Sequence, residues 1–140
     1  MEGKINHEAH EEHEGISASV ESVGREVVDA GLKVHRNLGP CLLESAYEHC
    51  LAHELGVRGL SVRRQVVLPI AYDGAILDAG YLLDMLIEEA VIIEVKAMEA
   101  LTRLSEAQLL TYLKMSRLRL GYLMNFNVRL FRDGLKRLVL

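Results

Sequence analysis

Residues 82–97 read LLDMLIEEAVIIEVKA, and this stretch decides the fold class of the chain. Two apolar runs stand on either side of Glu88-Glu89, a pattern that predicts two strands joined by a tight turn. The second run, AVIIEVKA at residues 90–97, is almost continuously apolar, which is typical of a strand buried on both faces of a sheet. The chain is therefore expected to fold around this strand pair.

The segments before the strand pair predict two helices and then a hairpin. The first helix begins at a Ser17 or Ser19 cap and stops at residues 37–40, NLGP, because Gly and Pro interrupt helices. A second helix covers residues 43–55. The hairpin is a strand over residues 62–72 and a long strand over residues 76–87, joined by Asp73-Gly74.

The segments after the strand pair predict one more helix and two more strands. The helix covers residues 102–116, and its buried side is expected to carry Leu104, Leu109, Leu110 and Leu113. Strands follow over residues 118–125 and 128–140, the last one turning at Asp133-Gly134. The resulting order, α-α-β-β-β-α-β-β, is that of an α/β protein.

Length and composition predict a single folded domain of ordinary soluble type. The chain has 140 residues, and none of its apolar runs reaches the roughly 20 residues that a membrane helix needs. The N-terminus lacks the apolar core of a signal peptide, so a cytoplasmic protein is expected. Cys41 and Cys50 are accordingly predicted to be reduced thiols that pack as small apolar groups.

Residues 1–15 differ from the rest of the chain. They are acidic and contain His7, His10 and His13, and we expect a disordered or frayed tail ahead of a domain at residues 16–140. The three-residue spacing of the histidines could chelate a metal only if the tail were helical. A passive tail is the favoured interpretation.

The net charge of −4 hides an uneven distribution. Residues 1–15 hold one Lys and five Glu, which sum to −4, so the remaining residues are neutral overall. Residues 103–137 hold eight Lys and Arg but only two acids, a local excess of +6. This excess predicts either a face that attracts a polyanion or a scattered, solvated surface, and charge alone leaves both open.

Two carboxylates are placed to face each other across the predicted turn. If the turn centres near residue 89, Asp84 and Glu94 lie opposite each other to within one residue. Facing carboxylates repel, and a charge inside an apolar strand is costly to bury. A divalent cation is the simplest compensation, because Mg²⁺ prefers hard oxygen ligands such as carboxylates.

Lys96 adds a cation to the same face of the strand, because side chains two residues apart project the same way. A Lys beside metal-bound carboxylates can orient water or stabilise charge that develops on phosphorus. A bound metal lowers the pKa of an attacking water, so the set suits phosphodiester hydrolysis. The alternative is an ordinary ion pair of Glu94 and Lys96 on an edge strand with Asp84 at the surface.

Three further polar residues are candidates for the same site. Gln108 and Tyr112 stand four residues apart and therefore share one face of the predicted helix. They could hold a water, the Lys or a nucleic-acid backbone, or they could be a half-buried polar pair. Glu44 begins the second helix, where the helix dipole favours a carboxylate whatever its function.

Several separated motifs resemble those of one family. They are VHRNLGP at 34–40, LLESAY at 42–47, Asp84, IEVKA at 93–97, EAQLLTYL at 106–113 and NFN at 125–127. Together they resemble the GxxExxY protein family, a bacterial and archaeal group within the PD-(D/E)xK nuclease superfamily. The resemblance implies a restriction-endonuclease-like αβββαβ core, with a mixed central sheet flanked by helices and the site at one edge of that sheet.

The resemblance also implies roles and partners. Asp84, Glu94 and Glu44 would bind Mg²⁺ or Mn²⁺, Lys96 would assist catalysis, and Gln108 with Tyr112 matches a Q-x-x-x-Y motif of exonuclease-like members. The expected substrate is nucleic acid, with DNA favoured, although the resemblance does not settle it. No membrane partner is expected, because no apolar run is long enough to span a membrane. A homodimer is one expected assembly, because a small domain has little surface to grip a duplex and the apolar C-terminal strands could pair between subunits.

Four positions depart from the resembled pattern. Cys41 replaces a glycine, Leu82 an arginine, Leu83 the proline before the aspartate, and Ser105 a histidine. None of these changes removes an implied metal ligand. They keep two alternatives open beside a nuclease: a catalytically weak or inactive nucleic-acid-binding module on the same fold, and a homo-oligomeric accessory protein.

Overall fold

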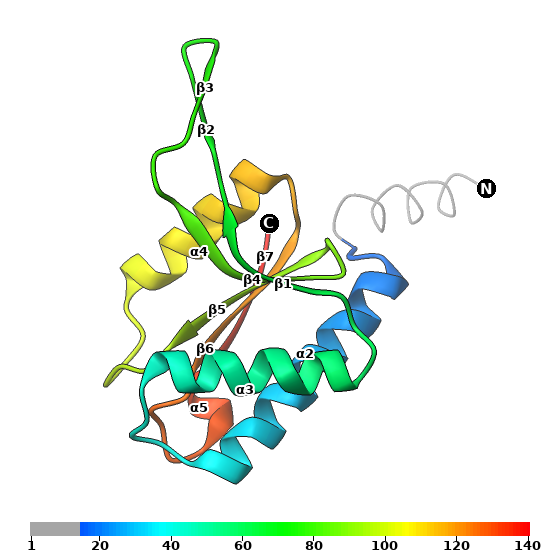
Figure 1. Cartoon of the computed structure of the whole chain (residues 1–140), viewed down its shortest axis with the longest axis vertical. Coiled ribbons are helices and arrows are strands. Elements are labelled where there is room, and N and C mark those ends of the chain that lie inside the picture. The colour runs from blue at the N-terminus through cyan, green and yellow to red at the C-terminus, as the bar shows by residue number, and fades with distance from the viewer. Residues whose placement is uncertain (1–14) are drawn as a thin grey trace, which may run out of the picture.

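A five-stranded mixed sheet in the order β1-β4-β5-β6-β7 forms the centre of the computed structural model, which describes residues 15–140 (Figure 1). The elements are α2 (Ala18–Leu38), α3 (Glu44–Val57), β1 (Val62–Val67), β2 (Ile70–Tyr72), β3 (Ala75–Leu77), β4 (Leu82–Ile87), β5 (Val91–Lys96), α4 (Arg103–Ser116), β6 (Leu120–Asn125), α5 (Phe131–Gly134) and β7 (Leu135–Val139). The predicted α/β class with a mixed central sheet is confirmed. The expected tail, with its three histidines, lies outside the described residues except for Gly15.

The predicted strand pair is β4 and β5, which run antiparallel with Ile87 opposite Val91. Glu88 and Glu89 form the turn, both with positive φ (52° and 53°), and the N–H of Ala90 donates to the carbonyl of Ile87 at 3.0 Å. Two central residues of positive φ are the signature of the type I′ turn that suits hairpins. β5 is the middle strand of the sheet, so the alternative of an ion pair on an edge strand is wrong.

The sheet separates two apolar cores because side chains alternate along each strand. On one face, Ile87 and Ile93 pack against α2 and α3 with Tyr47 and Leu51. On the other face, the core belongs to α4 and holds Leu86, Ile92, Leu109, Leu113 and Leu123. α4 also connects β5 to β6, which run parallel with Lys96 opposite Asn125. The site residues of β5 therefore lie between two well-packed layers.

Two predicted strands are interrupted. The segment 62–72 divides into β1 and β2 around Pro69, which has no N–H for a sheet ladder. The segment 76–87 divides into β3 and β4, because Gly80 has a φ of 80° and its N–H donates to Asp78 Oδ1 at 3.0 Å. β2 and β3 form a separate two-stranded sheet that projects from the body as an arm (Figure 1).

Smaller differences concern side chains and the C-terminal segment. Residues 128–140 contain the short helix α5 before β7 instead of one turning strand. Leu104 is 78% exposed, so the buried side of α4 rests on Leu109 and Leu113. Cys41 and Cys50 are free, as predicted, but both are exposed rather than packed. Within the described residues, no helix is both long and apolar enough to cross a membrane.

Candidate active site

Asp84 and Glu94 lie where the main-chain pairing of β4 and β5 ends. Met85 and Ile93 are the last paired residues of this ladder, and Asp84 and Glu94 occupy the next opposed positions. There the N–H of Asp84 donates to Glu94 Oε1 at 3.3 Å, and the N–H of Val95 donates to Asp84 Oδ2 at 2.8 Å. The two carboxylates replace the missing main-chain bonds, so the strands separate at this end while both side chains stay between them.

The sheet is also distorted on the other side of Asp84. β1 pairs with β4 through Arg64–Met85 and Val66–Leu83, but Gln65, which lies between, has a φ of 50°. A non-glycine residue with positive φ inside a strand is uncommon and interrupts regular pairing. Asp84 therefore lies between the irregular Gln65 of β1 and the point where its pairing with β5 ends.

Glu94 is a buried carboxylate beside a second one. Its side chain is almost inaccessible, with 3% of the residue exposed. Burial, followed by the charge of Asp84, raises the pKa of Glu94 to about 9. Desolvation and a like charge both disfavour the ionised form. A cation at this position would remove both penalties, so the donor set fits a hard divalent ion.

The carboxylates present fit a site with few protein ligands. No group of three or more His, Cys, Asp or Glu side chains within residues 15–140 is placed to hold a metal ion by itself. Mg²⁺ commonly takes one or two carboxylates and completes its shell with water and substrate oxygens. The pair of Asp84 and Glu94 therefore suits Mg²⁺ better than an ion that needs a full protein cage.

Glu44 lies at the first position of α3 and points its charge toward the same region. Desolvation and then the charge of Asp84 raise the pKa of Glu44, while Lys96 opposes the shift. Glu44 therefore lies close enough to Asp84 and Lys96 for their charges to affect its pKa. A third carboxylate at this distance can hold a water ligand or respond to a bound cation.

Lys96, Gln108 and Tyr112 approach the site from β5 and α4. Lys96 Nζ donates to Gln108 Oε1 at 3.4 Å, a long contact that orients the ammonium group toward α4. Tyr112 is 6% exposed, and burial followed by the charge of Glu94 raises its pKa. The structure thus brings together five of the six predicted site residues, and Glu44 approaches from the opposite face of the sheet.

Two supporting residues were missed by the sequence analysis. Glu48 is buried one helical turn after Glu44, and its Oε1 accepts from Gln65 Nε2 at 2.8 Å, at the irregular position of β1. Asn125 ends β6 and bonds the main chain of Met98 in both directions, at 3.0 and 2.9 Å. A signal existed for each: an acid four residues after Glu44, and an amide that ends an apolar strand.

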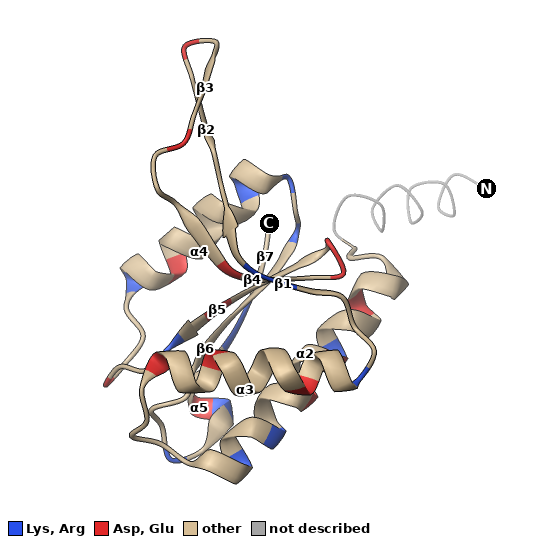
Figure 2. Cartoon of the chain, viewed as in Figure 1, with Lys and Arg blue, Asp and Glu red and all other residues tan. Residues whose placement is uncertain are grey.

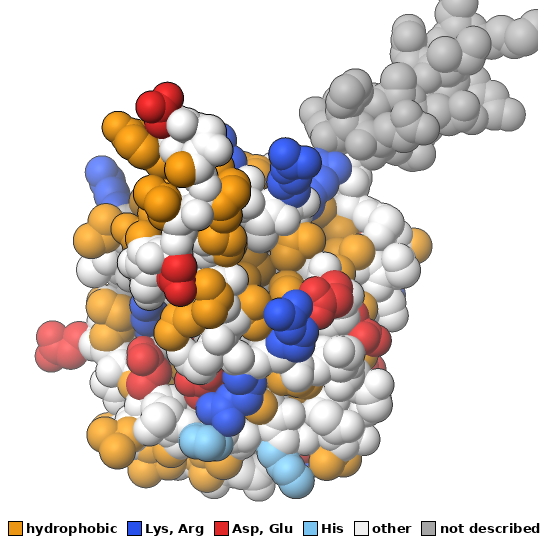
Figure 3. Space-filling model, turned by 45° about the horizontal axis from the view of Figure 1, so that its top comes forward, with side chains coloured by type: hydrophobic (Ala, Val, Ile, Leu, Met, Phe, Trp, Pro, Cys, Tyr) orange, Lys and Arg blue, Asp and Glu red, His pale blue; other side chains and the backbone are white. Residues whose placement is uncertain are grey.

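An open groove adjoins the site between the arm and α4. Its volume is about 510 Å³, and Tyr81, Gln108 and Tyr112 line it. The arm carries exposed apolar side chains and an acidic tip, as Figure 3 shows, and residues 68–82 contain no Lys or Arg. The groove is therefore apolar and open to solvent, and the arm gives it no positive charge.

The departures from the resembled pattern have structural accounts. Leu83 is 2% exposed and belongs to the core on the α4 face. Ser105 contributes to the cap of α4, because its N–H donates to Thr102 Oγ1 at 3.2 Å. Cys41 has a φ of 75°, a conformation that glycine adopts more readily than other residues. Position 41 therefore favours glycine for backbone reasons, not for chemistry.

Comparison with known protein families agrees with this geometry. A model described as the PD-(D/E)XK nuclease superfamily matches residues 21–138, which is most of the chain. The protein therefore belongs to the PD-(D/E)XK nuclease superfamily, whose membership implies a nuclease fold, a nucleic-acid substrate and the general use of divalent metals. No curated protein and no solved structure matches the chain significantly.

Proposed function

We propose that this protein is a nuclease of the GxxExxY type that hydrolyses phosphodiester bonds in DNA with Mg²⁺ or Mn²⁺. The observation that carries the proposal is the end of the β4–β5 pair. Two carboxylates, Asp84 and Glu94, stand there in place of main-chain hydrogen bonds, with Lys96 on the same strand. A purely structural sheet would gain nothing from burying the carboxyl group of Glu94 beside that of Asp84 at this point.

Each side chain has a proposed role. Asp84 and Glu94 would hold the metal, with Glu44 as a further acidic ligand, directly or through water. When bound, the ion supplies a water of lowered pKa and a contact for a phosphate oxygen. Lys96 would orient that water or stabilise charge on the phosphate in the transition state. Gln108 would hold Lys96 in position, since the two already make contact at 3.4 Å, and the hydroxyl of Tyr112 would bind water or the backbone beside it.

The test is calorimetric titration of Mn²⁺ into the wild type and a Glu94→Ala variant, followed by cleavage assays on plasmid and single-stranded DNA. We expect one binding event in the wild type, no binding in the variant, and cleavage only by the wild type. Glu99→Ala is a matched control, because it removes an exposed carboxylate that is not a proposed ligand. Cleavage by Glu94→Ala at the wild-type rate would overturn the assignment.

A non-catalytic nucleic-acid-binding module is the second candidate. Two observations favour it: no three acidic, His or Cys side chains in residues 15–140 form a metal cage, and Leu82 and Ser105 replace an arginine and a histidine of the resembled pattern. This candidate predicts salt-sensitive binding without metal-dependent turnover. DNA and RNA of the same sequence, assayed with and without Mn²⁺, would separate the two candidates and identify the substrate.

The proposal includes a homodimer formed through the arm. Tyr72 and Ile76 are 68% and 72% exposed on it, and the absence of Lys and Arg from residues 68–82 suits contact with another apolar surface better than contact with a polyanion. Sedimentation velocity of the wild type and of Ile76→Asp tests this: the wild type should sediment as a dimer and the variant as a monomer.

A further inference from the structure

Three arginines line an open hollow of about 680 Å³ at the C-terminal end of α2. The lining residues are Leu32, His35, Arg36, Gly39, Pro40, Arg129, Leu130 and Arg132, and we call this surface the arginine hollow. Arg36 comes from the last turn of α2, and the other two arginines come from the loop before α5 and from α5 itself. Figure 2 shows the corresponding blue segments gathered around α5 and the lower end of α2.

No acidic side chain in residues 15–140 neutralises these arginines. Within residues 15–140, none of Arg36, Arg129 and Arg132 forms an ion pair, although Asp133 is adjacent in sequence. Arg58 shows the contrast, because it binds the carboxylates of Glu26, Asp29 and Glu54. Three exposed guanidinium groups around one hollow repel one another, and an anion between them would relieve that repulsion.

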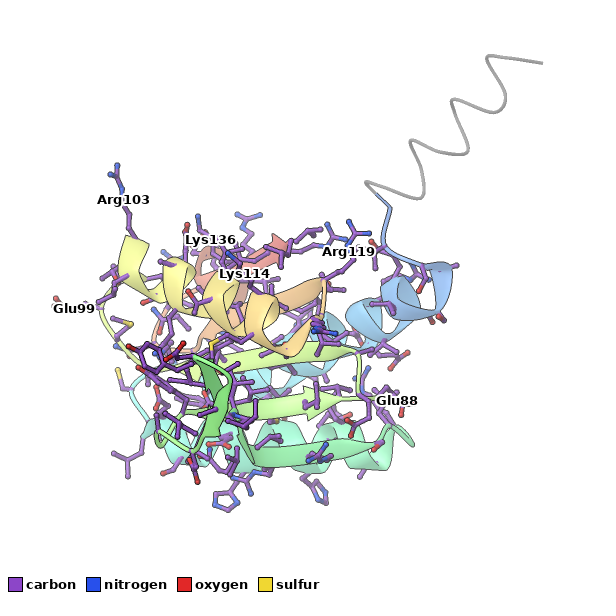
Figure 4. All side chains as sticks on the ribbon, turned by 90° about the horizontal axis from the view of Figure 1, so that it is seen from above. Glu88, Glu99, Arg103, Lys114, Arg119 and Lys136 are labelled. Atoms are coloured by element: carbon purple, nitrogen blue, oxygen red, sulfur yellow. The ribbon has the colours of Figure 1, made fainter. Side chains whose placement is uncertain are left out.

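The hollow divides the basic C-terminal quarter of the chain into two surfaces. Arg103, Lys114, Arg119 and Lys136 lie along the side of the sheet that carries α4 and β7 (Figure 4). On that side, Lys136 is already paired with Glu106. Part of the positive charge that has no acidic partner within residues 15–140 therefore lies in the arginine hollow. The order of residues in the sequence does not show this, because Arg36 is far from Arg129 and Arg132 along the chain.

The floor of the hollow is rigid. His35 Nε2 lies 2.7 Å from the carbonyl of Val128, and the His35 ring packs against Phe131 at 5.9 Å. Gly134 lies so close to β6 that an added Cβ would meet the carbonyl oxygen of Asn125 at 2.0 Å. α2, α5 and the intervening loop are therefore fixed relative to one another, and the arginines extend from a preformed frame.

The hollow lies at the same end of the sheet as the candidate active site. Lys96 is opposite Asn125 in the parallel ladder, and the N–H of Phe126 donates to the carbonyl of Lys96 at 3.0 Å. Arg129 follows Asn125 by four residues, so at most about 14 Å of chain separates their Cα atoms. The N–H of Cys41 also donates to Asn127 Oδ1 at 3.1 Å, which ties the loop leading to Glu44 to this segment.

We propose that the arginine hollow binds backbone phosphates of the nucleic-acid substrate, next to the scissile bond but not at it. The inference rests on the proposed function, in which nucleic acid is the substrate. Guanidinium groups bind phosphate oxygens in a bidentate manner and keep their charge at all physiological pH values. The hollow positions the strand, and the carboxylates and Lys96 act on the phosphate that reaches the end of β4 and β5.

The test is fluorescence anisotropy with a labelled 20-nucleotide single strand and its duplex, in EDTA and over a series of salt concentrations. The hollow variant is Arg36→Gln/Arg129→Gln/Arg132→Gln. Its matched control, Arg25→Gln/Arg103→Gln/Arg117→Gln, removes the same charge from arginines that form no ion pair within residues 15–140 and lie on other surfaces. Thermal melting of both variants establishes that they are folded.

We expect the hollow variant to bind about tenfold more weakly or worse, with a salt slope shallower by about 1 or more, and the control to stay within about threefold of the wild type. Equal losses in the two variants would overturn the hollow and leave general electrostatics as the explanation. A poly-glutamate peptide of the same net charge serves as a competitor for the oligonucleotide. If the wild type binds this peptide as tightly as the oligonucleotide, the nucleic-acid assignment of the hollow is overturned in favour of an acidic protein partner.

Cleavage assays on the same proteins keep this inference separate from the proposed function. Metal-dependent cleavage by the wild type, with unchanged binding in the hollow variant, would overturn the hollow alone. Binding that depends on the hollow, with no cleavage by the wild type in Mg²⁺ or Mn²⁺, would support the hollow and overturn the nuclease. A wild type that binds no nucleic acid would overturn both.

Discussion

The two ends of the β4–β5 pair are built on opposite principles. At the turn end, Ile87 pairs with Val91 through main-chain hydrogen bonds, and both side chains are fully buried. At the other end, three residues away along β4, Asp84 and Glu94 interrupt the ladder and bond to it with their carboxylates. One end gains stability from apolar burial, and the other retains a buried carboxyl group, Glu94, beside the partly buried Asp84.

This difference indicates how one hairpin can both support a fold and hold a reactive group. The apolar end fixes the register, so the position of Asp84 opposite Glu94 is determined before either carboxylate contributes anything. The carboxyl groups at the polar end lower the free energy of unfolding. The hydrophobic contacts elsewhere on the same strands offset this loss, so the fold tolerates the carboxyl groups. Substitutions at the two ends should therefore have opposite effects on stability and on activity.

The largest effect is expected from Lys96→Ala. Removing a cation that acts on the transition state should lower the cleavage rate by about 10²- to 10³-fold, while the free energy of unfolding changes by less than about 1 kcal/mol, because Lys96 is only partly buried. Single-turnover cleavage kinetics and urea denaturation measure the two quantities. Full activity in the variant would remove Lys96 from the proposed mechanism.

Ile87→Ala tests the apolar end. Ile87 is 0% exposed in the core beneath α2 and α3, and its truncation should lower the free energy of unfolding by about 3 kcal/mol through lost burial and a cavity. Ile87→Val, which keeps most of the side chain, should cost about 1 kcal/mol. Mn²⁺ affinity of the folded protein should stay at the wild-type value. A parallel loss of Mn²⁺ affinity would show that the two ends are not separable.

Glu94→Gln should change the free energy of unfolding in the direction opposite to Ile87→Ala. In EDTA at pH 8, the variant should be more stable than the wild type by about 1–2 kcal/mol, because an amide is neutral at every pH, whereas the carboxyl of Glu94 must take up a proton when the chain folds. It should also lose Mn²⁺ binding. Urea denaturation of both proteins and calorimetric titration provide the measurements.

The difference in stability between the wild type and Glu94→Gln should depend on pH. Folding raises the pKa of Glu94 from 4.5 to about 9, so the folded state retains this proton more strongly than the unfolded state does. The contribution of the neutral carboxyl to stability is complete below pH 4.5 and is lost as the pH rises toward 9. The advantage of Glu94→Gln should grow across that window, and a constant advantage would contradict the shift.

The smallest effect is expected in the turn. Glu88 and Glu89 both adopt positive φ, which Asn and Gly tolerate better, so Glu88→Asn/Glu89→Gly should raise the free energy of unfolding by about 1 kcal/mol. Glu88→Gln/Glu89→Gln removes the same charges without changing the backbone preference and should give little gain. Equal gains in the two variants would assign the effect to charge instead of backbone strain.

Periodicity and turn signals predicted most of the fold. The turn at residues 88–89, the strand buried on both faces and the serine cap of α2 all depend on residues near one another in sequence. The same local view failed at Pro69 and Gly80, where two long predicted strands break to form the arm. Those breaks depend on how far each strand can stay paired within the sheet, which periodicity does not report.

The roles of the candidate site residues stay predictions, but the structure shows where these residues lie. Asp84, Glu94, Lys96, Gln108 and Tyr112 all approach the same end of β4 and β5, as their positions on predicted elements implied. The separation of the strands at Asp84 was not foreseen, because it requires the irregular Gln65 on a third strand and its bond to Glu48. The effect of the irregular Gln65 on Asp84 can be predicted only when the pairing of β1 with β4 is known.

Four properties can be read from the amino-acid sequence without a structure: the strand pair, the burial of its second strand on both faces, the candidate residues of the site, and membership of the nuclease superfamily. These properties follow from local patterns and from motifs that stay in a fixed order along the chain. Two properties required the folded structure: which charges within residues 15–140 have no ion pair, as at Arg36, Arg129 and Arg132, and where the β4–β5 ladder opens. Both depend on contacts between segments far apart in sequence, whose geometry is set when the sheet and its helices close around a common core.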